Sequence, residues 1–541
     1  MNVRLSAAIF GSLLLAAPSP VVAQASAPAS RPQDLDPAQQ RALGAELLRH
    51  GRKEEAIAAY RGAWSADHSL DSALGLSKAC IADERYNDSL RVLEEAAQTH
   101  SKDVRLHRGF AEAFAARAAA RAAEGADRMT VLAEYEAAAR AIEDGLDLTP
   151  NDPALHVERT RYLVYACKSE EAHEAALAAR KSAPTSWEAA LLLGDSIVLQ
   201  LQDLGLLAAN GDAASDEEAR KERTAKLAEA KAAYEESEKL GPDRAEPPAR
   251  LASLLLQTGG PRGQVMTYLE RALARDPSKV DASPVERELS PKDALAFFEK
   301  ALAKRKEARG DAAAESPECA PLWWWIGRMR YMAEDHPGAE KAFSTAARLN
   351  PADDSARYYL AKIAYLEKRF GDAASEFDSV ARRSPKALAD LGRTDPHFAA
   401  MIRGVVGRLV TGDGAASASV TRVGGGGIGT AIHLTRALVE LDPRDVGEWN
   451  NLGLFYRDTN QPQEAIAAYR AAIDLTPRDP RLLNDAAVVY HYYLRANDEE
   501  AKALYKRAID AAKEILADRT AGTTRKEDAK GALDDAENNL E

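Results

Sequence analysis

Residues 449–477 read WNNLGLFYRDTNQPQEAIAAYRAAIDLTP, and this stretch decides the fold class. Its small residues, such as Ala465 and Ala472, allow two helices to approach closely, and the larger Tyr469 fills the gap between them. Pro477 ends the second helix because proline cannot continue one. The stretch therefore predicts a hairpin of two packed helices.

The proline that closes this stretch recurs along the chain. The prolines that keep this rhythm are Pro150, Pro184, Pro242, Pro277, Pro351, Pro385, Pro443 and Pro477. Their successive spacings are 34, 58, 35, 74, 34, 58 and 34 residues, and each 58 equals 34 plus 24. A period near 34 residues is typical of stacked helical hairpins, in which each repeat buries its apolar face against its neighbours. We therefore predict an all-α solenoid.

Residues at three fixed distances before these prolines form three columns of similar residue types. Twelve residues before each proline stand Ala138, Ala172, Ala230, Val265, Ala339, Ala373, Ala431 and Ala465. Eight before stand Ile142, Ala176, Tyr234, Leu269, Phe343, Phe377, Thr435 and Tyr469. Five before stand Gly145, Ala179, Ser237, Ala272, Ala346, Val380, Leu438 and Ala472. Because all three columns are in phase with proline, we expect them to form the contacts between packed helices.

The repeat resembles the tetratricopeptide repeat (TPR). The residues that match its whole signature are Trp449, Leu452, Gly453, Tyr456, Ala465, Tyr469, Ala472 and Pro477. A second copy, in which Arg330 replaces the usual tyrosine, is formed by Trp323, Ile326, Gly327, Ala339, Phe343, Ala346 and Pro351. Looser copies extend the pattern over most of residues 38–516. The resemblance implies a right-handed superhelical α-solenoid of helix-turn-helix repeats.

Breaks in this rhythm predict the organisation of the chain. The expected segments are a signal peptide (1–23), a disordered leader (24–36), an N-terminal TPR block (37–277), an irregular helical linker (278–321), a C-terminal TPR block (322–516) and a C-terminal capping helix (517–541). The two 24-residue excesses are expected inside helical hairpins, at about 204–223 and 411–430. The second includes the glycine run 424–429 and is predicted to be a flexible loop.

The first 23 residues have the pattern of an export signal. Arg4 supplies a positive start, Leu5 to Ala17 a short apolar core, and Val21-Val22-Ala23 a cleavage site of small residues. The apolar run is too short to span a bilayer. We therefore expect a soluble, exported protein that is periplasmic or extracellular.

Composition argues against several other classes of protein. The formal net charge is −13, whereas a nucleic-acid-binding surface needs a basic stripe and an anionic membrane attracts basic segments. Three scattered cysteines form no disulfide framework, and Cys80 is expected to be a buried thiol. The sequence holds no phosphate-binding loop, no paired histidines on one helix face and no Gly-x-Ser-x-Gly elbow. We therefore expect no catalytic site, no cofactor and no metal.

The TPR resemblance implies that the first helix of each repeat lines a concave groove. At the inner positions of two adjacent repeats the chain places Trp324, Arg328, Tyr331 and Met332, then Tyr358, Lys362, Tyr365 and Leu366. Aromatic residues and arginine often anchor docked peptides, and the cations suit an acidic or carboxylate-ended segment. The alternative for this wall is packing between repeats or against the irregular segment 278–320. Trp323 and Trp325 are assigned to packing.

The last full repeats offer a second set of groove residues. It consists of Asn450, Arg457, Asn484 and His491. The paired asparagines resemble those that grip a peptide backbone in TPR grooves. Leu454 and Val488 stand where the lysines of a carboxylate clamp would be.

These observations predict an exported TPR scaffold that docks a partner peptide in its groove. One alternative is a structural or assembly component of a cell-envelope complex, which would use its outer face or self-association. Another is an accessory to an enzyme, or a binder of a small molecule or glycan, through the surface of Trp324 and Tyr331. The sequence identifies no particular partner protein and no oligomeric state.

Overall fold

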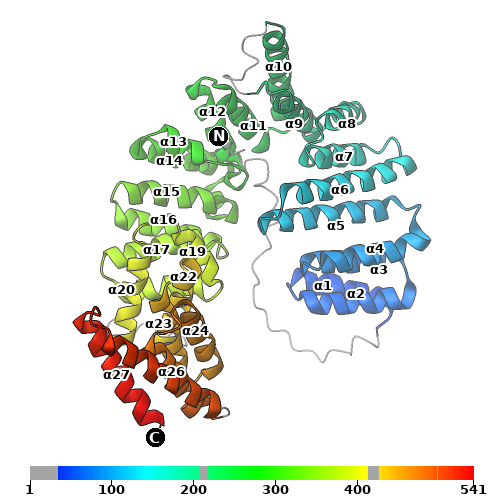
Figure 1. Cartoon of the computed structure of the whole chain (residues 1–541). Helices are drawn as coiled ribbons and strands as arrows, with labels where there is room; N and C mark the ends of the chain where they lie inside the picture. The colour runs from blue at the N-terminus through cyan, green and yellow to red at the C-terminus, as the bar shows by residue number, and fades with distance from the viewer. Residues whose placement is uncertain (1–34, 208–216, 412–425, 496–497, 541) are drawn as a thin grey trace. The chain divides into compact units, whose positions relative to one another are not determined.

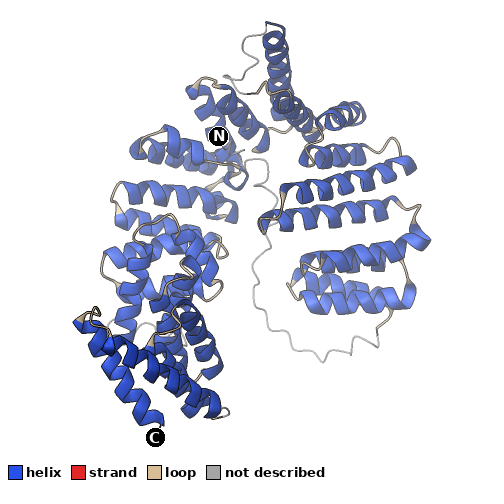
Figure 2. Ribbon diagram, viewed as in Figure 1, coloured by secondary structure: helices blue, strands red, loops and turns tan. Residues whose placement is uncertain are grey.

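All regular structure among the described residues of the computed structural model is helical (Figures 1 and 2). The structure describes residues 35–207, 217–411, 426–495 and 498–540. Within these ranges, none of the helices has the combined length and apolarity that a membrane span requires. The predicted signal peptide and most of the predicted leader lie outside the described residues.

The chain divides into two compact units. The first comprises the residues up to Leu289 together with Lys300–Gly310, and the second comprises Ser290–Glu299 and the residues from Asp311 onward. The helix α14 (Pro291–Arg309) contributes residues to both units. The other helices of the first unit are α1 (Pro37–Arg49), α2 (Lys53–Asp67), α3 (Leu70–Ala82), α4 (Tyr86–His100), α5 (Val104–Ala123), α6 (Arg128–Leu148), α7 (Pro153–Tyr165), α8 (Ser169–Ser182), α9 (Trp187–Asp203), α10 (Glu217–Leu240), α11 (Glu246–Thr258), α12 (Arg262–Arg275), the 3₁₀ turn η4 (Pro277–Lys279) and α13 (Ser283–Glu288).

The second unit begins with two 3₁₀ turns and continues with helical hairpins. Its elements are η5 (Asp311–Glu315), η6 (Pro317–Cys319), α15 (Ala320–Met332), α16 (His336–Leu349), α17 (Asp354–Leu366), α18 (Phe370–Ala381), α19 (Pro385–Gly392), α20 (Phe398–Thr411), α22 (Gly426–Leu441), α23 (Val446–Asp458), α24 (Pro462–Leu475), α25 (Pro480–Val488), the π-helical turn η8 (Val489–Leu494), α26 (Asp498–Ala517) and α27 (Thr523–Leu540). Neighbouring helices pack on one another within each unit, as a solenoid requires.

The three predicted columns are buried in every repeat. Ala138, Ala339 and Ala465 are fully buried, and the remaining members of the three columns are also in the buried class. Seven of the eight periodic prolines stand two residues after the end of a helix. The exception is Pro385, which follows the end of α18 by four residues. The expectation of an all-α solenoid is therefore confirmed.

The acidic residues that precede the first helices of repeats act as helix caps. The carboxylates of Asp152, Asp353 and Asp479 each accept a hydrogen bond from a backbone N–H in the first turn of the helix that follows. Such caps satisfy N–H groups that have no partner inside the helix.

Cys80 is 1% exposed, so its thiol is buried, as predicted.

The first 24-residue excess lies inside one helical hairpin. In an ordinary repeat a glycine of the first helix meets an aromatic ring 16 residues later; a Cβ added at Gly453 would lie 2.6 Å from the ring of Tyr469. Gly194 of α9 meets Tyr234 of α10 in the same way, with its added Cβ at 2.4 Å. These two residues are 40 apart, which is 16 plus 24. The hairpin contact is therefore kept. The excess is divided between longer helices, since α9 and α10 have 17 and 24 residues against 13 and 14 in α23 and α24, and a longer connection between them.

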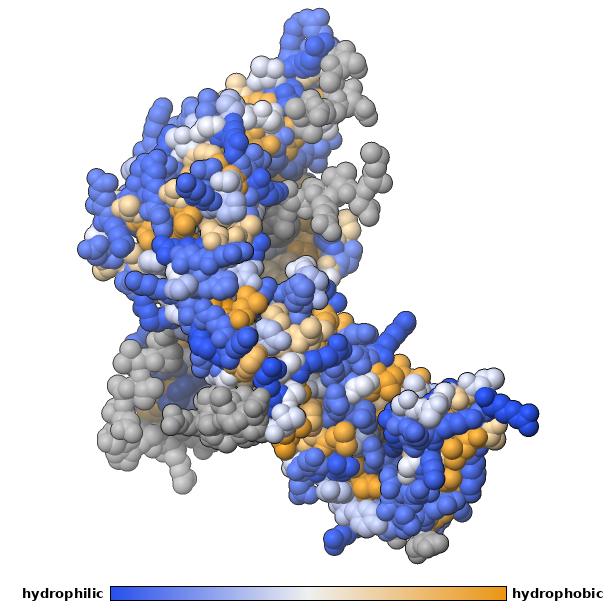
Figure 3. Space-filling model, turned by 90° about the vertical axis from the view of Figure 1, so that its left-hand side faces the viewer, coloured by the Kyte–Doolittle hydropathy of each residue, from blue (hydrophilic) through white to orange (hydrophobic). Residues whose placement is uncertain are grey.

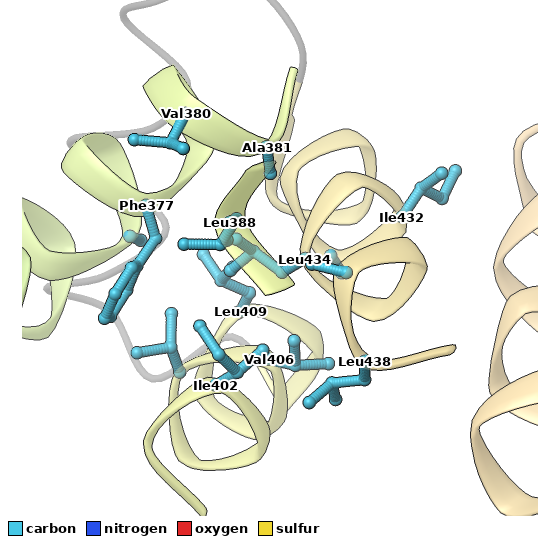
Figure 4. Packing of buried hydrophobic residues seen from close by; sticks show 14 of the residues in the cluster. Phe377, Val380, Ala381, Leu388, Ile402, Val406, Leu409, Ile432, Leu434 and Leu438 are labelled. Carbon is cyan, nitrogen blue, oxygen red and sulfur yellow. The ribbon is translucent and has the colours of Figure 1, made fainter. Parts of the chain in front are cut away.

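The second excess is built differently from the predicted loop. The short helix α19 ends at Gly392, the chain turns, and the additional helix α20 packs against α18 and α22 (Figure 4). Side chains of these helices, such as Leu388, Ile402 and Leu434, share one buried core. Residues 426–430 were expected in the flexible loop but form the start of α22, and Thr430 is only 4% exposed. Packing against α19 and α20 overrides the low helix propensity of glycine there. Residues 412–425 lie outside the described residues.

Two other predicted segments also contain helices. The predicted linker 278–321 includes α13, α14 and both 3₁₀ turns that precede α15. The predicted capping segment 517–541 includes α27, which packs on α25 and α26.

The space-filling view of one face shows hydrophilic residues over most of the surface, with apolar residues in separate patches (Figure 3).

Candidate functional site

The helices α15 and α17 bring most of the predicted central residues together around Tyr359. The centroid of the Tyr359 ring lies 5.9 Å from that of Trp324, 5.4 Å from that of Tyr331 and 5.8 Å from that of Tyr358. Its other neighbour is Phe343 of α16, whose ring is stacked at 4.8 Å with an angle of 6° between the planes. Tyr359 is not among the predicted groove residues, because the inner-face positions include only one of the two adjacent tyrosines.

Both predicted cations lie over faces of these rings. The guanidinium carbon of Arg328 is 5.7 Å from the ring centroid of Trp324 and 5.9 Å from that of Tyr359, whose hydroxyl accepts a hydrogen bond from Arg328. The ammonium of Lys362 is 5.4 Å from the ring centroid of Tyr331 and 5.6 Å from that of Tyr359. Such cation–π contacts stabilise partly desolvated cations. We call Trp324, Arg328, Tyr331, Tyr359 and Lys362 the central cluster.

Asp395 balances the charge of Lys362. It lies in the connection between α19 and α20, and its Oδ2 is 2.5 Å from the Lys362 ammonium and 2.8 Å from the Tyr358 hydroxyl. Burial alone would raise the pKa of Asp395, but hydrogen bonds from Lys362, the His397 N–H and Tyr358 together lower it. Burial and the hydrogen bond to Asp395 raise the pKa of Tyr358. The Asp395–Pro396 pair is a turn signal in the sequence, but it does not reveal that the carboxylate returns to α17.

The chain itself covers part of the predicted groove wall. Tyr358 is only 4% exposed and lies beneath the inner surface, contrary to its expected place on it. Tyr365 packs on Phe370 at 5.5 Å, and a Cβ added at Gly404 of α20 would lie 2.8 Å from its hydroxyl oxygen. The reason is the break after Gly392, because the chain turns back and brings Asp395, Phe398 and Gly404 against side chains of α17. The groove residues of α17 are therefore largely occupied by the chain's own insertion.

Two apolar side chains beside the central cluster remain exposed. Met332, which ends α15, is 47% exposed, and Leu366, which ends α17, is 50% exposed. They occupy equivalent positions 34 residues apart in successive repeats. They therefore offer a contact surface that the fold itself does not use.

The three consecutive tryptophans of α15 differ in their surroundings. Trp323 donates its indole N–H to the carbonyl oxygen of Ala314 at 2.8 Å, and Trp325 stacks on Phe298 at 5.6 Å, so both serve packing as predicted. The buried indole N–H of Trp324 has no acceptor among the described residues. An unpaired buried donor costs free energy, so the Trp324 N–H would gain from an acceptor that the described residues do not supply.

The predicted residues of the last repeats are separate from the central cluster in the chain and have other partners. Asn450 of α23 is half-buried, and its side-chain oxygen has no donor in the described part of the chain. Arg457 forms an ion pair with Asp458 at 3.0 Å. Asn484 is 6% exposed, and its oxygen accepts a hydrogen bond from Asn539 of α27 at 3.5 Å. His491 stacks on Tyr492, with their ring centroids 4.3 Å apart.

Asp485, next to Asn484, is a half-buried acid that is not among the residues predicted from the sequence. Burial raises the pKa of Asp485 to about 6, and the nearby carboxylates of Asp479 and Asp535 add to this effect, while Arg457 and Arg481 oppose it. The hydroxyl of Tyr469 near this acid is buried and has no hydrogen-bond partner among the described residues. Asp485 stands two residues before the buried Ala487, a position that gives no sign of this environment in the sequence.

Sites of other kinds receive little support from the described residues. No group of three or more metal-binding side chains is found in the described ranges. The imidazoles of His100 and His107 each bond to a backbone carbonyl oxygen instead, at 3.0 and 2.9 Å. The first unit holds a cavity of about 550 Å³ between α4, α5 and α6. Its lining combines apolar and small side chains with the polar or charged side chains of His107, Glu136, Arg140 and Asp144.

Comparisons with known proteins agree with the repeat pattern. Residues 333–387 and 446–479 each match a model described as tetratricopeptide repeat. Over 84 residues the chain is 33% identical to the photosystem I assembly protein Ycf3 of Rippkaea orientalis (strain PCC 8801 / RF-1). This match covers 14% of the chain and 49% of that protein, so the chain spans about half the length of this curated relative.

Solved helical-repeat structures also resemble the chain. Yeast Tom70 is 16% identical, with coverage of 93% of this chain and 96% of Tom70 and a TM-score of 0.25. The human IFIT1 dimer with PPP-AAAA is 17% identical, with coverage of 82% of this chain and 95% of IFIT1 and a TM-score of 0.28.

Together, the proline rhythm, the buried columns and the two matched segments identify the repeat unit. Tetratricopeptide repeats are generally non-catalytic scaffolds for protein–protein interaction. The chain therefore contains tetratricopeptide repeats, which are matched at residues 333–387 and 446–479.

Proposed function

We propose that this protein is an exported scaffold that docks a segment of a partner protein on the inner face of α15 and α17. The observation that carries the proposal is the central cluster with its flanking apolar pair. Aromatic and arginine side chains lie beside Met332 and Leu366, which the fold leaves exposed. Residues of these types dominate the energetics of protein interfaces.

The chemistry of the cluster suggests what the docked segment carries. The Trp324 N–H lacks an acceptor among the described residues, and Arg328 lies over the same ring. A backbone carbonyl or carboxylate of a partner would supply such an acceptor. Lys362 contributes less to recognition of an acid because Asp395 already balances its charge. An apolar side chain next to that acceptor would contact Met332 and Leu366. The docked segment would therefore carry both a hydrogen-bond acceptor and an apolar side chain.

The inner-face surface can be tested without disturbing the core. We expect the double variant Met332→Ala/Leu366→Ala to weaken capture of a partner from an envelope extract by about tenfold, which corresponds to about 1.4 kcal/mol of lost apolar contact. The measurement is the amount of each protein retained by the full-length chain as bait. Both side chains are about half exposed, so the variant should fold normally by circular dichroism.

The matched control is Leu177→Ala/Leu204→Ala. These leucines lie in other repeats and are 50% and 51% exposed, so the control removes similar apolar area. A partner lost with the first variant and retained by the control supports docking at α15 and α17. A partner that both variants retain equally would place the interaction elsewhere and overturn the proposal.

Export has its own test. The positive start at Arg4, the apolar run and the small residues before Gln24 predict removal of the first 23 residues. We expect the protein recovered from outside the cytoplasm to begin at Gln24 by N-terminal sequencing or mass spectrometry. An exported protein that still begins at Met1 would disprove this part of the proposal.

A further inference from the structure

A cavity in the first unit is formed by three consecutive helices. It has a volume of about 550 Å³, and its lining includes Ala97 of α4, Phe110 and Phe114 of α5, and Ala137 and Asp144 of α6. Natural small-molecule sites have volumes of about 300–1,000 Å³, and most are apolar with a few polar groups. The cavity therefore has the size and the composition of a ligand site.

Two aromatic rings contribute to the apolar part of the lining. Phe110 and Phe114 lie about one turn apart on α5, and their rings are stacked with centroids 6.4 Å apart and an angle of 23° between the planes. Both side chains are half-buried and pack against two buried clusters, one that includes Leu93 of α4 and one that includes Ile142 of α6. The core therefore fixes the two rings, while part of their surface faces the cavity.

Small side chains keep the cavity open. Ala133, Ala137 and Ala141 follow one another at intervals of four residues on α6, so they lie along one face of that helix. Ala97 of α4 also lines the cavity. A larger aliphatic side chain at any of these positions would fill space that alanine leaves empty. The two aromatic rings are consequently not covered by the neighbouring helices.

One charged group of the lining has no counter-charge. Glu136 forms ion pairs with Arg140 and, at 3.1 Å, with Lys168. The imidazole Nε2 of His107 donates a hydrogen bond to a backbone carbonyl oxygen at 2.9 Å. By contrast, Asp144 is exposed and forms no hydrogen bond or ion pair with any residue of the described ranges. The cavity therefore combines an apolar surface with an unpaired carboxylate.

We propose that this cavity binds a small organic cation with an apolar body, whose ammonium group lies at Asp144 and whose apolar part lies on Phe110 and Phe114. Hydrogen bonds between an ammonium and a carboxylate are stronger than those between neutral groups. The faces of aromatic rings also attract cations, and the apolar body removes the two rings from water. Asp144 would instead repel an anion. This inference goes beyond the proposed docking on α15 and α17 and does not depend on it.

Three probes that share one phenylbutyl body test the charge preference: phenylbutylammonium, phenylbutanol and phenylpentanoate. Each is titrated into the full-length chain at neutral pH, and ligand-observed NMR measures its Kd. We expect a Kd of about 1 mM for the ammonium probe, which suits a ligand of this size. The alcohol should bind about tenfold more weakly because it lacks the charge-assisted hydrogen bond, and the carboxylate probe should show no saturable binding.

Two substitutions separate the role of the carboxylate from that of the apolar lining. Asp144→Asn should lower the affinity for the ammonium probe about tenfold and leave the affinity for the alcohol unchanged. Ala137→Leu should fill part of the cavity and weaken the binding of both probes. The matched control is Asp147→Asn, which removes an exposed carboxylate of the same helix that does not line the cavity. This control should bind all three probes as the unmodified protein does.

Several results would overturn the proposal. One is the absence of saturable binding by the ammonium probe, and another is equal binding of the ammonium and the alcohol, which would indicate a purely apolar cavity. An affinity that fell equally in Asp144→Asn and Asp147→Asn would assign the preference to the charge of the whole helix. Circular dichroism checks that Ala137→Leu keeps its helices. If that variant does not fold, Ala97→Leu fills the cavity from α4 and should weaken the binding of both probes in the same way.

Discussion

Phe343→Ala is expected to lower the free energy of unfolding of the C-terminal repeats by about 3–5 kcal/mol, the usual cost of emptying a buried aromatic site. Phe343 is fully buried in α16, where it stacks on Tyr359 and meets Trp324 edge-on at 6.5 Å. It also fills the space that Gly327 leaves open, since a Cβ added there would lie 2.9 Å from the ring. The loss would therefore remove both the hairpin contact and the support beneath the central cluster.

Urea unfolding followed by circular dichroism measures this effect, with Leu366→Ala as the control. Leu366 is 50% exposed, so its truncation should change stability by less than about 0.5 kcal/mol. If Phe343→Ala changed stability no more than the control, the repeats would not share the core described here. The variant should also weaken partner capture, because the rings of the central cluster would lose their fixed positions.

Asp395→Ala is expected to destabilise the second unit by about 3 kcal/mol, because it leaves the Lys362 ammonium without its counter-charge. The side chains of Asp395 and Lys362 are only 10% and 16% exposed. The change also removes the acceptor of the Tyr358 hydroxyl. The double variant Lys362→Met/Asp395→Ala should recover most of the loss, since replacing both members of a buried ion pair by apolar groups is often neutral.

The pH dependence of this effect has a defined sign. The pKa of Asp395 is lower in the folded protein than in the unfolded chain, so its contribution is fully present above the unfolded value of about 3.9. It is lost as the pH falls through the lower folded value. Urea unfolding at pH 5 and pH 7 should therefore give the same difference between the unmodified protein and Asp395→Ala. A difference that shrank between these two pH values would contradict the assigned pairing.

Periodic features of the fold could be predicted because each repeat imposes the same packing demand. The columns at Ala339, Phe343 and Ala346 recur in phase with proline, and every member of the three columns is buried. The position of the first 24-residue excess also followed from the period alone. Helix α20 could not be predicted in this way, since it replaces the regular course of one repeat and has no counterpart with which to align.

The residue types of the candidate site could be predicted from the sequence, but the exposure of their side chains could be predicted only in part. Trp324, Arg328, Tyr331 and Lys362 meet as the inner-face positions suggested, because these positions follow from helix geometry. Tyr358 and Tyr365 are covered because the chain turns back after Gly392. This covering is a tertiary contact, so the local sequence does not predict it. Asp395 owes its role to Tyr358 and Lys362, which are distant in sequence, so no local pattern marks it.

The preserved contact between Gly194 and Tyr234 has a practical consequence for protein engineering. Both residues pack as in an uninterrupted repeat. The packing of α9 on α10 therefore does not depend on the length of the segment that joins them. Doubling the length of a connection costs only about 0.6 kcal/mol of closure entropy. A fluorescent protein or an affinity tag could therefore be grafted into this connection and leave the repeats on either side in register. Such a chimera would report on the whole array while both chain ends stay free.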